Sequence, residues 1–432
     1  MDMEHTDLLL DILRRLPPCS LAVSRCVCTA WRGTVDHHHL LRADLLPLSL
    51  DAVIYNELQM DPPKLFGRRL TTRYITSNLD YVADDPDYTD FVLDYCNGLF
   101  LVESVKVVNP ATRQWARLPL VKCGPCHSNR YLAYDPTVSP HYEVFFIPRI
   151  RAASAETICS ALEGEVMHVY SSKTHVWKEK SFVREGDAAG TIQDVQSCYN
   201  SDRSMYYTAY WQGSLYVPSR HIKNAFLLRI NLSTDKYQVI KLPKAGVGDF
   251  RLGRSKKGVY CVLHTNVPCT FQVWFLHESC GSIDWVFKNE INLEPAFSKE
   301  WHAGPWIPQP PEKIELLLQN DVNLKLVDEY NQALRKDDFE WDSEDENVVS
   351  ITDWPKKCDD DIRVLYCLGF HPYKEIVLFH QTRLCPCSVV AYHLSSSKVR
   401  YLGQLLPRCR YSTEEISFAY TPCWMMDLPG RN

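Results

Sequence analysis

The first forty-five residues carry the spacing of an amphipathic helix. Apolar side chains recur there at intervals of one, three and four residues, at Leu8, Leu9, Ile12, Leu13 and Leu16. This spacing places them on one broad helical face. We expect Asp7 to cap the helix, because its carboxylate can accept from free first-turn amides. Pro17-Pro18 should end it, since neither residue has an amide hydrogen.

Two further short helices are predicted. Ser20 can begin one that carries Leu21, Val23, Cys26 and Val27, and Thr29 can cap one that carries Trp31 and Val35. Three short helices in about forty residues bury too little surface to be robust alone. We therefore expect them to leave apolar area for a partner or for the next domain.

From about residue 90, the pattern changes to short strands. Runs rich in β-branched and aromatic residues alternate with Gly, Pro, Asn, Asp or Ser, as at 100–102, 144–147, 166–170, 227–230, 259–263 and 376–379. No helical pattern of comparable strength separates these runs, which disfavours a parallel nucleotide-binding sheet. The remainder of the chain is predicted to be mainly β.

A loose internal repeat runs through the β-rich part. In each copy a strand ends in a polar turn and an aromatic residue follows, at 107–119, 169–177 and 230–243, with a degenerate copy at 392–399. Trp115, Trp177 and Tyr237 stand 62 and 60 residues apart, and Trp285 follows after 48. Such a period is close to that of a kelch-type propeller blade. A pair of β-sandwiches with coincidental spacing is the alternative.

The propeller interpretation carries three further expectations. The copies suggest six or seven blades. An early run at residues 51–56 should complete the last blade and close the ring. The acidic segment 337–346 should form a solvated loop between blades.

Composition limits the function classes. The chain has 432 residues, a net charge of −6 and no apolar run of membrane-spanning length, so we expect neither nucleic acid nor a membrane as partner. Its 17 cysteines are scattered singly through apolar runs, which favours reduced thiols in the cytoplasm, the nucleus or both.

Candidate chemistry is sparse. Cys123-Gly124-Pro125-Cys126 with His127 has metal-like spacing, but the second ligand pair that structural zinc requires is lacking nearby, and Cys385-Pro386-Cys387 is far away in sequence. His37-His38-His39 is better explained as an exposed joint. The sequence contains neither a phosphate-binding glycine loop nor a nucleophile elbow. We predict no cofactor, no metal site, no catalytic residues and no enzymatic activity.

The N-terminal segment resembles an F-box. Four separated motifs fall in the register of that family: Leu16-Pro17, Ser20-Leu21, Arg25-Cys26-Val27 and Trp31-Arg32. The Leu-Pro pair that opens the family pattern is absent, and Glu4-His5 stands in its place. The resemblance implies an F-box domain at residues 1–45 that binds the Skp-type adaptor of a cullin–RING ubiquitin ligase.

The remainder resembles the F-box-associated, kelch-like β-propeller of plant proteins. The matching motifs are Cys96-Asn97-Gly98-Leu99, Asn109-Pro110-Ala111-Thr112, 132–136, 139–144 and 369–375. This resemblance implies a propeller domain over residues 46–432 that follows the F-box.

Together the two resemblances imply the substrate-recognition subunit of an SCF-type (Skp–cullin–F-box) ubiquitin ligase, whose propeller binds an unknown protein target. The residues expected in the adaptor contact or its supporting core are Leu9, Ile12, Leu13, Leu16, Pro17, Leu21, Val27 and Trp31. One alternative is a kelch-like propeller scaffold whose degenerate F-box no longer docks. A propeller enzyme is another.

Overall fold

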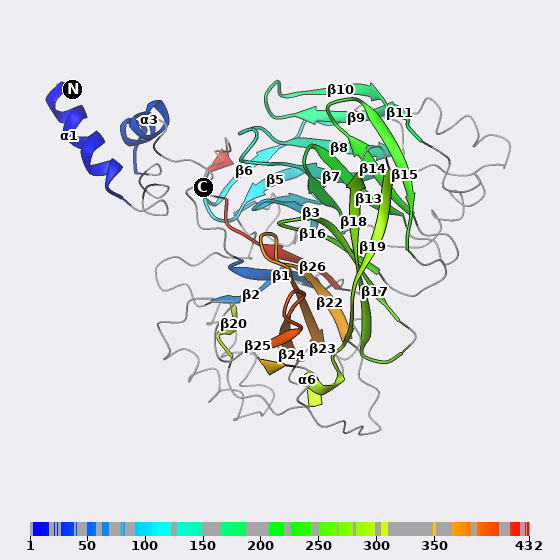
Figure 1. The fold of residues 1–432 in the computed structure, drawn as a ribbon. Helices are drawn as coiled ribbons and strands as arrows, with labels where there is room; N and C mark the ends of the chain where they lie inside the picture. Colours follow the sequence, from blue (N-terminus) through cyan, green and yellow to red (C-terminus); the bar gives the residue numbers. More distant parts are fainter. Residues whose placement is uncertain are drawn as a thin grey trace.

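Six β-sheets form a propeller in the computed structural model, and two helices, α1 (Met3–Arg14) and α3 (Thr29–His37), lie at one edge of it (Figure 1). The predicted mainly β fold with N-terminal helices is confirmed, and the number of blades is six. The structure describes residues 3–16, 21, 24, 27–38, 40, 50–57, 63–68, 79, 81–82, 91–121, 128–148, 166–186, 207–219, 226–243, 250–265, 267–279, 282–298, 304–309, 349–350, 365–381, 387–405, 415–423, 428 and 430–431.

The first three blades follow the chain from the centre of the ring outward. Blade 1 consists of β3 (Val92–Cys96), β4 (Leu99–Val102), β5 (Lys106–Asn109) and β6 (Gln114–Arg117), with β27 (Gly430–Arg431) added outside. Blade 2 consists of β7 (Ser128–Ala133), β8 (Glu143–Pro148), β9 (Val166–Ser171) and β10 (Val176–Ser181). Blade 3 consists of β12 (Ala209–Trp211), β13 (Ser214–Ser219), β14 (Phe226–Asn231) and β15 (Lys236–Lys241), with β11 (Val183–Arg184) outside.

The next two blades repeat this order. Blade 4 consists of β16 (Phe250–Ser255), β17 (Gly258–His264), β18 (Thr270–Ser279) and β19 (Ser282–Asn292), and the short helix α6 (Glu294–Ser298) follows it. Blade 5 consists of β22 (Leu365–Phe370), β23 (Ile376–Gln381), β24 (Cys387–His393) and β25 (Lys398–Leu405), with β21 (Val349–Ser350) outside.

Blade 6 is assembled from distant parts of the chain. Its strands are β26 (Glu415–Tyr420), β1 (Ala52–Glu57), β2 (Lys64–Arg68) and β20 (Trp306–Gln309). β1 pairs with β26 in antiparallel register, from Ala52 opposite Tyr420 to Glu57 opposite Glu415. The prediction that an early strand closes the ring is therefore confirmed.

Burial within the blades explains the strand sequences. Every residue of β4, β5 and β23 is buried, because these strands lie inside a blade with a neighbouring blade on either face. The outermost strand β10 has no buried residue. Even the buried Lys106 of β5 is satisfied, since its Nζ donates to the carbonyl of Val82 at 2.5 Å and lies over the ring of Trp115.

The repeat seen in the sequence is the outer hairpin of four blades. Its copies are β5–β6, β9–β10, β14–β15 and β24–β25. In each copy the residue immediately before the last strand has a positive φ: Arg113, His175, Asp235 and Ser397. Hairpins that combine a type I turn with one left-handed residue follow the twist of the flanking strands. The shared turn therefore sets the blade geometry.

The repeated aromatic residue joins adjacent blades. Trp177 in β10 donates from Nε1 to the carbonyl of Pro119 at 2.7 Å, just beyond the outer strand of blade 1. Trp285 in β19 donates in the same way to the carbonyl of Lys241 at 2.9 Å, at the end of β15. The indole in the fourth strand of one blade thus binds the chain at or just beyond the fourth strand of the preceding blade.

The structure corrects the predicted N-caps of both helices. The structure starts α1 at Met3, so Asp7 lies within the helix and its predicted role as N-cap is wrong. The carbonyl of Cys28 accepts from the amide of Arg32 at 3.0 Å, which places the cap of α3 one residue before Thr29. α1 ends at Arg14, just before the Pro17-Pro18 pair, as expected.

Some expectations stay predictions. The domain boundary at 45–46 and the acidic loop 337–346 lie outside the described residues. Among the helices that the structure describes, none combines the length and the apolar character that crossing a membrane requires.

The C-terminal segment crosses from blade 6 to blade 1 and is fixed there by polar contacts. Asn109 Nδ2 donates to the carbonyl of Cys423 at 2.9 Å, and the amide of Thr421 donates to the hydroxyl of Tyr95 at 2.9 Å. The amide of Leu428 donates to Gln114 Oε1 at 3.1 Å, and β27 then pairs with β6. The chain end therefore closes the ring a second time.

The Asn97-Gly98 turn between β3 and β4 lies against this segment. Both residues have positive φ, 47° and 88°, as a type I′ hairpin requires. A Cβ on Gly98 would lie 2.6 Å from the Cβ of Cys423. Gly213 has a similar φ of 74° in the β12–β13 turn, but a Cβ there would meet no atom within 4 Å.

We predict that Gly98→Ala destabilises the protein far more than Gly213→Ala. Gly213→Ala is the control and introduces only the strain of a left-handed backbone conformation, about 1–2 kcal/mol. Gly98→Ala adds a collision with the C-terminal segment, which should cost about 1–3 kcal/mol more. Urea unfolding of both full-length variants measures the difference. Equal destabilisation would show that the C-terminal segment does not hold blade 1.

Candidate partner-binding surface and propeller channel

A small apolar core holds the N-terminal helices together. Its fully covered members are Leu13 of α1, Val35 of α3 and Leu21, which is helical and lies between them. Partly buried side chains surround these three: Leu9, Leu16, Trp31 and Leu40. Several of the apolar residues at helical spacing in the sequence therefore form the core of the helices themselves.

The structure divides the eight residues expected at the adaptor contact into three groups. Leu13 and Leu21 are buried and support the fold. The partly buried ones are Leu9, Leu16 and Trp31. Ile12 and Val27 are 49% and 61% exposed, and Pro17 lies outside the described residues.

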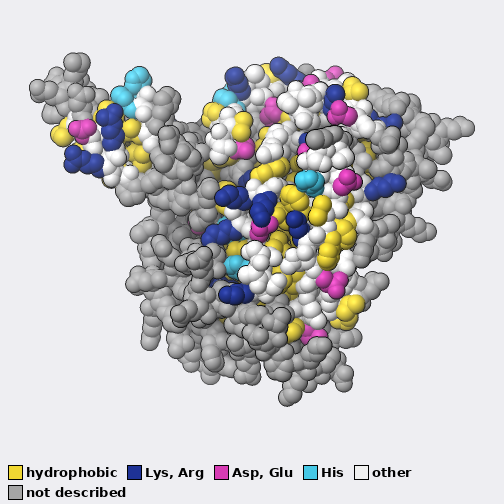
Figure 2. Space-filling view, in the orientation of Figure 1, with side chains coloured by type: hydrophobic (Ala, Val, Ile, Leu, Met, Phe, Trp, Pro, Cys, Tyr) yellow, Lys and Arg dark blue, Asp and Glu magenta, His cyan; other side chains and the backbone are white. Residues whose placement is uncertain are grey.

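Leu8 was not among the eight expected residues, and it is 60% exposed. It stands one helical turn before Ile12, so the two side chains share a face of α1. Figure 2 shows hydrophobic side chains at the surface of the two helices, beside Lys and Arg side chains. The one ion pair described on α1, Arg14 with Asp11 at 3.9 Å, is exposed and adds little stability. We call three exposed residues, Leu8 and Ile12 of α1 and Val27 in the turn before α3, the apolar helix surface.

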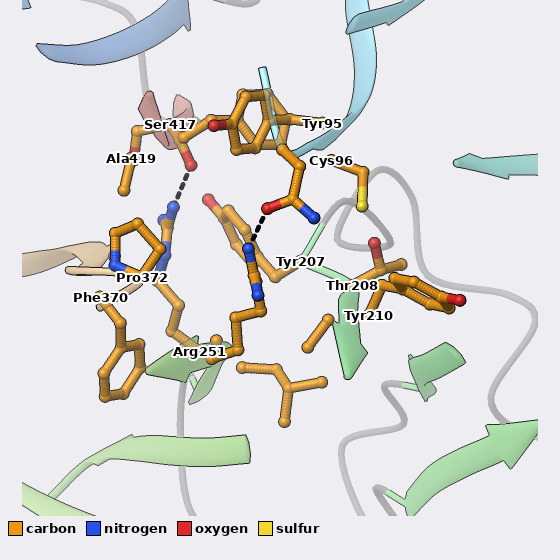
Figure 3. Close-up of a pocket in the computed structure, with 17 residues that line it drawn as sticks. Tyr95, Cys96, Tyr207, Thr208, Tyr210, Arg251, Phe370, Pro372, Ser417 and Ala419 are labelled. Atoms are coloured by element: carbon orange, nitrogen blue, oxygen red, sulfur yellow. Dashed lines mark hydrogen bonds between the residues drawn. The ribbon is translucent and has the colours of Figure 1, made fainter. Parts of the chain in front are cut away.

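The second candidate is a pocket at the centre of the propeller, which we call the channel pocket (Figure 3). Its cavity has a volume of about 80 Å³ and opens to solvent. Side chains from β3, β16, β22 and β26 line it, together with residues at the start of β12. The polar and aromatic lining residues include Tyr95, Asn97, Tyr207, Tyr210, Arg251, Arg254, Phe370 and Ser417.

Asp94 of β3 lies behind this lining and joins three blades. One carboxylate oxygen accepts from the amide of Leu132 in β7 at 2.7 Å, and the other accepts from the hydroxyl of Thr208 at 2.8 Å. Burial raises the pKa of Asp94 to about 7, and the two hydrogen bonds oppose that rise. Its role is to connect inner strands.

No group of three or more metal-ligating side chains occurs within the part of the chain that the structure describes. Cys123-Gly124-Pro125-Cys126-His127 and Cys385-Pro386 lie outside those residues. The described lining of the channel pocket contains arginines and tyrosines and has no carboxylate or histidine.

Residues 5–43 match the F-box domain family. The chain carries an F-box domain joined to a six-bladed β-propeller. F-box protein At5g07610 of Arabidopsis thaliana is 23% identical over 248 residues, which cover 52% of this chain and 54% of that protein. F-box protein At3g07870 of the same plant is 22% identical over 336 residues, covering 70% and 73%.

The chain thus spans about half the length of the first of these relatives. A chain in the crystal structure of the mitotic checkpoint complex is similar at 11% identity and a TM-score of 0.34. The match covers 82% of this chain and 89% of that one. A likeness this low says nothing about function.

We predict that Asp94 makes stability fall as pH rises from about 4 to about 7. In that window the folded protein holds a proton that the unfolded chain, with the ordinary carboxyl pKa, has released. The slope is about 1.4 kcal/mol per pH unit for one such group. Asp94→Asn keeps an acceptor for the amide of Leu132 and can donate to the hydroxyl of Thr208, so it should remove this slope.

Urea unfolding near pH 5 and pH 8 tests the prediction. The stability advantage of Asp94→Asn over the wild type should grow by roughly 3 kcal/mol between the lower and the higher pH. Asp284→Asn, at an exposed position of β19, is the matched control and should follow the wild type. A constant offset between wild type and Asp94→Asn at both pH values would contradict the role of Asp94.

Proposed function

We propose that this protein is the substrate-recognition subunit of an SCF-type ubiquitin ligase. The F-box domain would dock a Skp-type adaptor, and through it a cullin–RING ligase, while the propeller would bind a protein target. The observation that carries the proposal is the F-box match at residues 5–43 combined with the exposed apolar helix surface.

Docking would be driven mainly by burial of this surface. Leu8, Ile12 and Val27 are each about half or more exposed in a unit whose own core is already filled. Covering one such side chain contributes roughly 1.5–3 kcal/mol. Three of them on a short helical unit are enough to form the centre of an interface in which a few residues dominate.

The propeller would contribute by holding the target near the ubiquitin-charged enzyme, which raises its local concentration. We propose that the protein performs no chemistry itself, in keeping with the carboxylate-free described lining of the channel pocket. A reducing compartment, the cytoplasm or the nucleus, suits the six cysteines that the structure describes as free thiols.

A scaffold whose F-box no longer docks is the second candidate. It is favoured by one observation: α1 runs without interruption through Glu4-His5, where the F-box pattern has Leu-Pro. Under this alternative the apolar helix surface would face solvent or another protein.

We predict that Ile12→Asp lowers the affinity for a purified plant Skp-type adaptor at least tenfold, because a carboxylate would be buried in the apolar contact. Stability should change little, since Ile12 is exposed. Isothermal titration with the full-length chain measures the affinity. Leu120→Asp, at an 85% exposed leucine of the propeller, is the control and should bind as the wild type does.

Two results would separate the candidates. If the wild type fails to bind adaptor at micromolar concentration, the proposed function is wrong. If adaptor binding then appears in the double variant Glu4→Leu, His5→Pro, the degenerate scaffold is the better description. Unchanged affinity in Ile12→Asp would place the contact elsewhere on the chain.

A further inference from the structure

Arg251 is a buried cation without a described carboxylate partner. Its side chain is on β16, the residue is 7% exposed, and its Nη2 donates to the backbone carbonyl of Ser417 (Figure 3). The guanidinium lies 3.7 Å from the centre of the Tyr207 ring. Both contacts are with neutral groups, which compensate a buried charge only in part.

Arg254, three residues further along β16, is partly buried and also has a neutral partner. It donates to Asn97 Oδ1, again a neutral acceptor. A guanidinium has five N–H donors. Within the described residues, neither arginine forms an ion pair with Asp or Glu, and each has one described hydrogen bond.

Arg229 in blade 3 shows the contrast. It donates to a carboxylate oxygen of Glu278 at 2.9 Å, to Gln238 at 3.0 Å and to Tyr216 at 3.2 Å. An arginine at the periphery of this propeller is thus neutralised and well supplied with acceptors. The two at its centre are not.

Asp94 is the carboxylate closest in sequence to the lining, and its own partners occupy it. Its two oxygens accept from Leu132 and Thr208, and burial favours its protonated form. Asp135 lies near enough to raise the pKa of Cys96 and of Tyr210, both in the lining, but it forms no ion pair with either arginine among the described residues. The two guanidinium groups can therefore still bind an anion from outside the chain.

The walls beside the arginines are flat and apolar. Tyr95, Tyr207 and Pro372 line the channel pocket beside the arginines. Phe370 and Tyr210 also reach the lining, but they pack against the apolar clusters between blades. Small-molecule sites commonly combine such walls with a few placed polar groups. A bare inorganic ion would use the charge and leave the walls unused.

We propose that the channel pocket binds a small organic anion, a carboxylate on a flat apolar or aromatic body, with Arg251 and Arg254 binding its oxygens. Guanidinium groups match carboxylates in geometry and form charge-assisted hydrogen bonds with them. The aromatic walls would cover the body of the ligand. This site goes beyond the proposed adaptor role and does not depend on it.

The test uses 1-naphthoate as probe, 1-naphthamide as its uncharged counterpart and inorganic phosphate as a bare anion. Isothermal titration of the full-length chain at fixed ionic strength measures each. We expect saturable binding of naphthoate and at least tenfold weaker binding of naphthamide, since the charge-assisted hydrogen bonds are lost. Phosphate should bind more weakly than naphthoate.

Arg254→Gln should weaken naphthoate binding roughly tenfold or more, because one charged contact disappears. Arg254 is only partly buried, so this variant is more tolerable to the fold than a change at Arg251. Arg184→Gln, an exposed arginine of β11, is the matched control and should bind as the wild type does. Adaptor binding by the same preparations, measured separately, reports on folding and on the proposed function.

Three results would overturn the site: no saturable naphthoate binding below about 1 mM, equal binding of naphthamide, or unchanged affinity in Arg254→Gln. Binding of phosphate in preference to naphthoate would overturn the apolar body of the ligand. None of these results bears on whether the helices dock the adaptor.

Discussion

The pairing of β1 with β26 is the contact on which the rest of the propeller depends. It joins residues more than three hundred and fifty positions apart in the chain, through six aligned residue pairs. Without it, β26 would be separated from the other three strands of blade 6, and the neighbouring blades would expose sheet faces that are fully buried in the ring. An open array of blades would also present unpaired strand edges, which favour aggregation.

The C-terminal segment reinforces the same junction from the other side. After β26 it turns toward blade 1, where the side chains of Tyr95, Asn109 and Gln114 bind its backbone. Asn109 has two roles, since its Oδ1 also accepts from the amide of Ala111 within the β5–β6 turn. The Asn-Pro-Ala-Thr motif thus shapes a hairpin and holds the chain end. Such long-range contacts must offset the entropy cost of closing a very long loop.

Local patterns predicted the elements well, and long-range contacts were predicted only in outline. Periodicity located α1 and the outer hairpins, because turns such as the one ending at Arg113 are determined by neighbouring residues. Spacing alone could not divide the apolar face of α1: Leu13 and Ile12 are adjacent in sequence, yet one is buried and the other exposed. The start of α1 at Met3 was missed, because Asp is a common N-cap residue and the apolar spacing begins only at Leu8, directly after Asp7.

The channel pocket could not have been predicted from the sequence, because its geometry exists only in the closed ring. Arg251 of blade 4 reaches Ser417 of blade 6, and Arg254 of blade 4 reaches Asn97 of blade 1. These hydrogen bonds cross the centre of the propeller and connect strands that no sheet pairing joins. Any anion bound between the arginines would bind only the closed ring, and would therefore stabilise it through mass action. Ring closure and occupancy of the pocket are in this way linked thermodynamically, whereas the apolar helix surface lies over a separate small core made of N-terminal residues.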